Sequence, residues 1–73
     1  MSRGEGALTR REREILLHLA SGRADKEIAA LLALSPTTVH KHVANILSKM
    51  NARSRTEAAM RAVREGMFEQ ATD

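Results

Sequence analysis

The sequence predicts an all-α protein, and three observations lead to this expectation. Its 73 residues suit a single domain, and 42% of them are apolar although Phe68 is the one aromatic residue. A core of Leu, Ile, Val, Ala and Met suits packed helices better than a sheet. Apolar residues also recur at helical spacing in four segments separated by start and stop signals. We therefore expect a compact four-helix domain over residues 8–68.

The first helix is expected at residues 10–20. Thr9 and Glu12 have the spacing of a capping box, in which each side chain satisfies a backbone N–H group at the helix start. The apolar residues that follow at helical spacing are Ile15, Leu16 and Leu19. Gly22 lies just past them, where a left-handed C-terminal cap usually needs glycine. Residues 1–7 show no period, so we expect a flexible leader or the end of a linker there.

Two more helices are expected at residues 25–32 and 36–50. The shorter one has an apolar stripe made of Ile28, Ala29 and Leu32. The longer one starts with Ser35 and Pro36, a capping hydroxyl followed by proline at the first helical position. Only residues 33–35 separate the two helices. A short helix, a three-residue turn and a longer helix form a helix-turn-helix arrangement, in which the first helix braces the second across the DNA backbone.

The fourth helix is expected to begin after Ser54 and to end near Glu65. Ser54 and Glu57 repeat the capping-box spacing, and Gly66 is the stop signal. The apolar residues of this segment are Ala58, Ala59, Ala62 and Val63. Residues 69–73 are expected to form a flexible tail.

Placing successive residues about 100° apart separates two faces of the third helix. The residues expected to face the core are Val39, Val43, Ile46, Leu47 and Met50. The opposite face carries the small, polar or basic residues Thr37, His40, Lys41, Ala44 and Ser48. Small residues permit close approach, while hydroxyl, imidazole and ammonium groups meet base edges and phosphates. This face favours DNA contact; the alternative is an ordinary solvated helix surface.

The distribution of charge supports the DNA interpretation. The net charge is +3, and residues 28–56 contain Lys41, Lys49, Arg53 and Arg55 but no acidic residue. A polyanion would therefore meet the protein along this segment. The arginines of the first helix alternate with acidic residues, so we interpret them mainly as self-paired surface charge, with DNA backbone contact as the alternative. The set concerned is Arg10, Arg11, Glu12, Arg13 and Glu14.

Several stretches together resemble a known family. They are residues 8–16 (LTRREREIL), Gly22, residues 26–29 (KEIA), residues 34–42 (LSPTTVHKH) and residues 54–59 (SRTEAA). In this order and spacing they resemble the LuxR/FixJ/NarL (GerE-type) helix-turn-helix domain, and in particular the output domain of NarL-branch response regulators. The resemblance implies a four-helix fold, with the third helix in the DNA major groove and the fourth forming a homodimer on a two-fold DNA site.

The resemblance also implies roles for individual positions. Family members read bases from the positions of His40, Lys41 and Ala44. The positions that hold the DNA backbone match Thr37, Thr38 and Lys49, and Lys26 completes the expected DNA-binding set. His40 and Ala44 stand where other members often carry basic residues, so we expect specificity to depend on Lys41, the threonines and dimer spacing.

Two further expectations concern the second and fourth helices. Ala24 stands where the family usually has Ser or Thr, which leaves Asp25 as the expected cap of the second helix. The candidate dimerisation residues are Ala59, Met60, Val63 and Met67. Core packing is the alternative for Ala59 and Val63, whereas Met60 and Met67 are harder to bury within one domain.

Other kinds of site find little support in the sequence. There is no Cys, Tyr or glycine-rich phosphate loop, so we expect neither catalysis nor a small-molecule cofactor. His40 and His42 are two residues apart and point about 200° apart on a helix, which excludes joint chelation of a metal. The longest apolar run, residues 28–34, is far too short for a membrane span, and we expect a cytoplasmic protein.

The function that these features favour is sequence-specific binding of double-stranded DNA by a bacterial transcriptional regulator. Homodimers would bind half-sites about one helical turn apart, and RNA polymerase is a further expected partner. Such a domain usually follows a receiver or ligand-binding domain, so the chain is either a separated output domain or a stand-alone regulator. The alternative is a helical dimerisation module without DNA binding. A σ-factor region 4 domain shares the opening helix pattern, but residues 39–42 and 54–59 argue against it.

Overall fold

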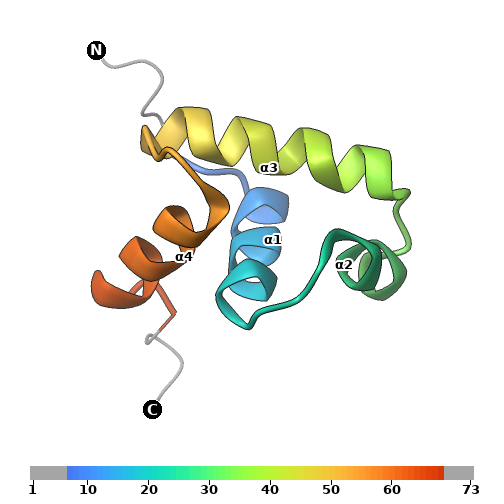
Figure 1. Cartoon of the computed structure of the whole chain (residues 1–73), viewed down its shortest axis with the longest axis horizontal. Coiled ribbons are helices and arrows are strands. Elements are labelled where there is room, and N and C mark those ends of the chain that lie inside the picture. The colour runs from blue at the N-terminus through green and yellow to red at the C-terminus, as the bar shows by residue number, and fades with distance from the viewer. Residues whose placement is uncertain (1–6, 69–73) are drawn as a thin grey trace.

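The computed structural model describes residues 7–68, and four helices follow one another along this part of the chain (Figure 1). They are α1 (Arg10–Ala20), α2 (Asp25–Leu32), α3 (Pro36–Met50) and α4 (Arg55–Arg64). The expected all-α fold is confirmed. The expected leader, apart from Ala7, and the expected tail at 69–73 lie outside the described residues.

The helices begin where local hydrogen bonds replace the missing intrahelical ones. At α1, Thr9 Oγ1 accepts from the Glu12 backbone N–H at 3.0 Å, and Glu12 Oε1 accepts from the Thr9 N–H at 2.9 Å. This is the expected capping box. At α3, Ser35 Oγ accepts from the Thr38 N–H at 3.1 Å, and Pro36 occupies the first helical position. Both predicted starts are confirmed.

Two of the predicted caps differ in the structure. The expectation that Asp25 caps α2 is wrong: Ala24 is the cap residue and has no side-chain oxygen, so Glu27 Oε1 accepts from the Ala24 N–H at 2.8 Å. At α4, Ser54 accepts from the Glu57 N–H as expected, but Glu57 Oε1 accepts from the Arg53 N–H at 2.7 Å. The second half of that capping box is therefore displaced by one residue.

All four helices end through a residue in the left-handed conformation. These residues are Gly22 (φ 84°), Ala33 (φ 58°), Asn51 (φ 56°) and Gly66 (φ 71°). In each case the next backbone N–H reaches back five residues, as in a Schellman motif. The four bonds join Arg23 to His18, Leu34 to Ala29, Ala52 to Leu47 and Met67 to Ala62. Among the four, Ala33 is the residue least suited to a left-handed backbone.

We expect Ala33→Gly to stabilise the domain by about 0.5–1 kcal/mol. Glycine relieves the left-handed strain at φ 58°, and its larger freedom in the unfolded chain offsets part of this gain. Thermal and urea denaturation measure the effect. Ala30→Gly, at an exposed helical position of α2, is the matched control and should lose about 1 kcal/mol. Equal destabilisation by the two changes would show that Ala33 is not strained.

The core lies where α1 meets α3 and α4, and α2 completes it by packing against α3. The largest fully buried side chains are Ile15, Leu16, Ile28, Val39 and Ile46. The predicted apolar stripe of α3 is confirmed, since Val43 is also buried and Leu47 and Met50 pack against the core. In Figure 1, α3 runs along the top of the domain, and the other three helices lie beneath it. Within the described residues, no helix is long and apolar enough to cross a membrane.

Candidate nucleic-acid interface

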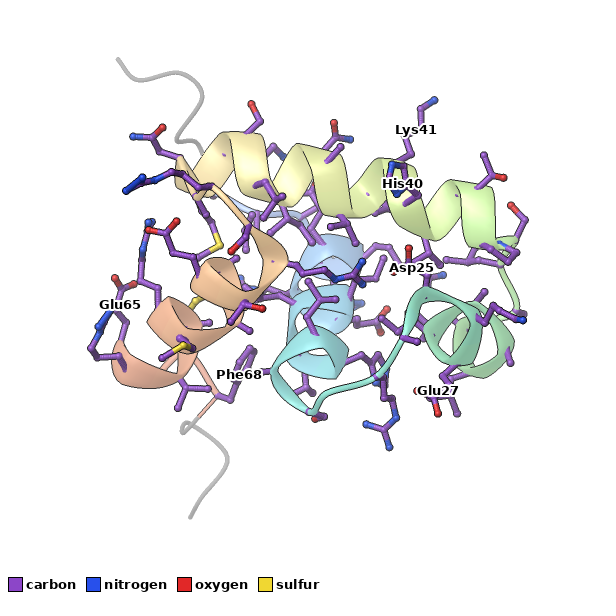
Figure 2. All side chains as sticks on the ribbon, viewed as in Figure 1. Asp25, Glu27, His40, Lys41, Glu65 and Phe68 are labelled. Atoms are coloured by element: carbon purple, nitrogen blue, oxygen red, sulfur yellow. The ribbon has the colours of Figure 1, made fainter. Side chains whose placement is uncertain are left out.

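The outer face of α3 presents the residues that the helical spacing places there. Thr37, His40, Lys41, Ala44 and Ser48 are all exposed. Lys41 points away from the other helices in Figure 2. Because the opposite stripe is buried in the core, this face is turned toward solvent along the helix. It offers hydroxyl, imidazole and ammonium groups beside a small residue, which is a surface able to approach a groove of DNA closely.

Two other expected contact residues, Lys26 and Thr38, lie in the first turns of α2 and α3. Lys26 is exposed on the first turn of α2, and it lines a shallow cleft with Arg23 and Arg55. Thr38 is half-buried, and its Oγ1 accepts from Ser35 Oγ at 2.9 Å. This hydrogen bond holds the Thr38 hydroxyl beside Ser35 at the start of α3.

Lys49 is engaged inside the domain. Its Nζ donates to Glu12 Oε1 at 2.8 Å, and the Glu12 residue is only 4% exposed. The interpretation of Glu12 as self-paired surface charge is therefore wrong, although Arg11 and Glu14 do pair at 3.1 Å on the surface of α1. Contact between Lys49 and the DNA backbone stays a prediction, and any such contact shares the ammonium with Glu12.

The Glu12 carboxylate is stabilised in its charged form. Burial opposes ionisation, but the hydrogen bonds from Lys49 and from the Thr9 backbone, with the Lys49 charge, hold the pKa of Glu12 below its ordinary value. This pair connects the start of α1 to the end of α3. Sequence reasoning missed it because Glu12 also fits a capping box, and a capping residue is usually exposed.

A second ion pair joins α2 to α4 next to the outer face of α3. Arg55 Nη2 donates to Asp25 Oδ1, and the other carboxylate oxygen of Asp25 lies 3.9 Å from His40 Nδ1. Asp25 is labelled between α2 and α3 in Figure 2. In the sequence Asp25 is expected only as a helix cap, because no spacing rule relates positions 25, 40 and 55.

The candidate dimerisation residues divide into two groups. Met60 is 62% exposed and Val63 is 57% exposed, and with Ala20, Ala59 and Arg64 they line an apolar groove between α1 and α4. Ala59 is buried at the base of this groove, which fits its interpretation as a core residue. Met67 instead packs against the core and lines a different groove with Phe68. Its part in a dimer interface stays a prediction.

No group of three His, Asp or Glu side chains in residues 7–68 is arranged to hold a metal ion.

Comparison with known proteins gives the family. Residues 6–62 match the model of the family described as bacterial regulatory proteins, luxR family. The chain is 49% identical over 57 residues to an uncharacterized transcriptional regulatory protein, YhcZ, of Bacillus subtilis, covering 78% of this chain and 27% of that protein. It is 54% identical over 54 residues to the transcriptional regulatory protein UhpA of Salmonella typhimurium, covering 74% of this chain and 28% of that protein. It is 42% identical over 62 residues to the response regulator protein VraR of Staphylococcus aureus, covering 85% of this chain and 30% of that protein.

The chain thus spans less than a third of the length of these relatives, while the family match covers all four helices except the end of α4. The resemblance drawn from the sequence motifs is confirmed. The chain belongs to the luxR family of bacterial regulatory proteins.

Proposed function

We propose that this chain binds double-stranded DNA sequence-specifically, as the output domain of a bacterial transcriptional regulator of the response-regulator type. The observation that carries the proposal is the outer face of α3, which is exposed to solvent and has no acidic residue along its length. Family membership and the response-regulator relatives support it. In this proposal α3 enters the major groove, and the shorter α2 crosses the DNA backbone.

The proposed contacts follow from side-chain chemistry. His40, Lys41 and Ala44 meet base edges: imidazole and ammonium groups form hydrogen bonds there, and the Ala44 methyl group suits a thymine methyl. Lys26, Thr37 and Thr38 contact phosphates, because they flank the start of α3 from both helices of the motif. Lys49 is a weaker candidate, since its ammonium already pairs with Glu12.

The electrostatic part of the affinity is expected to be modest. Of the basic side chains in residues 28–56, Lys49 pairs with Glu12 and Arg55 pairs with Asp25. With only two or three phosphates neutralised per domain, the slope of log K against log salt concentration would be roughly −2 to −3. Specificity would then depend on base contacts more than on a row of cations.

Titration of duplex DNA at two salt concentrations tests the proposed function. A random duplex pool gives both the bound sequences and the spacing of paired half-sites. We expect retardation at low salt, a weakening with salt of the size just given, and one enriched sequence. Absence of retardation even at low salt contradicts the proposal, and self-association without DNA binding would favour a protein-interaction module instead.

We further propose that two copies associate through the apolar groove that contains Met60 and Val63, so that their α3 helices meet successive major grooves. Met60→Glu should place a charge in this interface and weaken binding to a paired site by roughly tenfold or more, because the second contact is no longer linked to the first. Binding to a single half-site should be unchanged. Gel retardation on paired and single sites measures both, and Leu17→Glu on α1 is the matched exposed control. Equal loss on both kinds of site would show that Met60 acts on folding or on DNA contact.

A regulator of this type acts on the chromosome in the cytoplasm, and RNA polymerase is its proposed protein partner. The family is one of DNA-binding regulators rather than of enzymes.

A further inference from the structure

Asp25 divides its carboxylate between two helices that flank it. Oδ1 accepts from Arg55 at the first position of α4, and Oδ2 faces Nδ1 of His40 on α3 at 3.9 Å. The Asp25 side chain is 25% exposed, while that of His40 is 77% exposed. The carboxylate is thus held by Arg55, and Figure 2 shows Asp25 below His40, which lies on α3.

We propose that Asp25 is a specificity-determining residue: it fixes which ring nitrogen of His40 carries the proton, and thereby which bases His40 accepts. The proposal rests on the proposed function, in which His40 meets a base edge. His40 is the group that touches DNA, and Asp25 acts through it as a positioning residue.

A neutral imidazole has one N–H donor and one nitrogen acceptor. A carboxylate has only acceptors, so Asp25 favours the form in which Nδ1 carries the proton and points toward Oδ2. A small rotation of the exposed ring closes the 3.9 Å gap. Nε2 is then an acceptor that faces outward from α3.

An outward acceptor selects a base with an amino group in the major groove. Cytosine offers its N4 amine and adenine its N6 amine, whereas guanine offers only acceptors there. Lysine or arginine, which only donate, would select guanine instead. The combination of His40 with Asp25 is therefore expected to invert the base preference that a basic residue at this position would have.

Arg55 makes the arrangement compatible with DNA. Its guanidinium offsets the charge of Asp25, which would otherwise repel phosphates close to the groove. It also holds Oδ1, so that Oδ2 is the oxygen left for His40.

The first test uses the full chain without DNA. Long-range ¹H–¹⁵N correlation spectra at pH 8 distinguish the two neutral forms of His40, and its signals are assigned by comparison with His40→Ala. We expect the Nδ1–H form in the wild type and a mixture in Asp25→Ala. In Asp25→Asn the one amide oxygen stays with Arg55 and the amide N–H group faces His40, so we expect the Nε2–H form. The same form in Asp25→Ala as in the wild type overturns the proposal.

The second test selects duplex DNA from a random pool at pH 8. At one position of each half-site we expect a preference of about five- to tenfold for an amino-bearing base over guanine at pH 8. Asp25→Ala should reduce this preference to about twofold or less and leave the other positions unchanged. Asp25→Asn should move it toward guanine, because Nε2 then carries the proton and donates. His40→Ala should abolish the preference.

The outcomes separate this proposal from the proposed function. If wild-type protein selects a sequence but Asp25→Ala selects the same one equally strongly, the role of Asp25 is overturned and DNA binding stands. If wild-type protein selects no sequence, the proposed function fails, and the specificity proposal fails with it.

Discussion

Lys49→Met is expected to destabilise the domain by about 2–3 kcal/mol at pH 7. The change removes the Nζ group that lies 2.8 Å from Glu12 Oε1 and leaves Glu12, a residue that is 4% exposed, with no cation beside its carboxylate. Breaking a buried ion pair on one side costs about 3–5 kcal/mol, and we expect somewhat less here because the Lys49 side chain is 30% exposed. For a domain of this size the melting temperature should fall by roughly 10–20 °C.

Urea denaturation followed by circular dichroism measures the effect. The matched control is the double variant Glu12→Gln with Lys49→Met, in which neither member of the pair is charged. It should be more stable than Lys49→Met alone, because the unpaired buried charge is the main cost. A loss below about 0.5 kcal/mol for Lys49→Met would instead place the pair with ordinary surface ion pairs.

The dependence of stability on pH independently tests whether the charged carboxylates of Glu12 and Glu57 stabilise the fold. The pKa values of Glu12 and Glu57 lie below their ordinary value of 4.5. Burial raises the pKa of Glu12, but the hydrogen bonds from Lys49 and Thr9, with the charge of Lys49, lower it further. For Glu57 the hydrogen bond from the Arg53 backbone N–H is the main cause. Both groups therefore bind protons more tightly in the unfolded chain. Their stabilisation is present above the unfolded pKa and is lost as the pH falls through the folded pKa.

Lys49→Met should weaken this dependence for Glu12. Burial and the hydrogen bonds of Thr9 stay, but the hydrogen bond and charge of Lys49 are lost, so the pKa of Glu12 is lowered less and the variant loses less stability than the wild type as the pH falls. Denaturation midpoints between pH 3 and pH 7 should thus converge for the wild type and the variant at low pH. Parallel curves would contradict the assignment of Glu12.

Ala44→Glu is expected to weaken DNA binding by about 100-fold or more while the fold is retained. Ala44 is exposed on α3, one turn from His40 and from Ser48, so the change adds no strain to the core. A carboxylate at this place faces phosphates and base acceptors, and like charges in an interface cost several kcal/mol. Each 1.4 kcal/mol is about a tenfold loss of affinity.

Fluorescence anisotropy with the selected duplex measures the loss, and circular dichroism checks the fold. Leu17→Glu removes the same unit of net charge on α1, in the groove with Met67 and Phe68 on the side of the domain away from α3. It should weaken binding by about threefold at most, because charges farther apart than about 10 Å are largely screened at 0.1 M salt. Equal losses for the two variants would mean that α3 does not approach the DNA.

The sequence by itself determined the helices and the outward face of α3. Their signals are local: Thr9 with Glu12, Ser35 with Pro36, and the glycine stop signals each act within a few residues of a helix end. Helical periodicity then sorted α3 into a buried stripe and an exposed face, because each residue turns by a fixed angle along the helix. The motif order was sufficient to place the chain in its family.

Tertiary structure alone decided the electrostatics around that face. Glu12 meets Lys49 across 37 positions of sequence, and Asp25 meets Arg55 across 30. Neither pairing follows from helical spacing, because it depends on how four helices cross once their apolar stripes are buried together. For the same reason Met67 packs against the core while Val63 is left exposed. Burial of apolar surface has no direction of its own, so the fold determines which charged and apolar side chains meet.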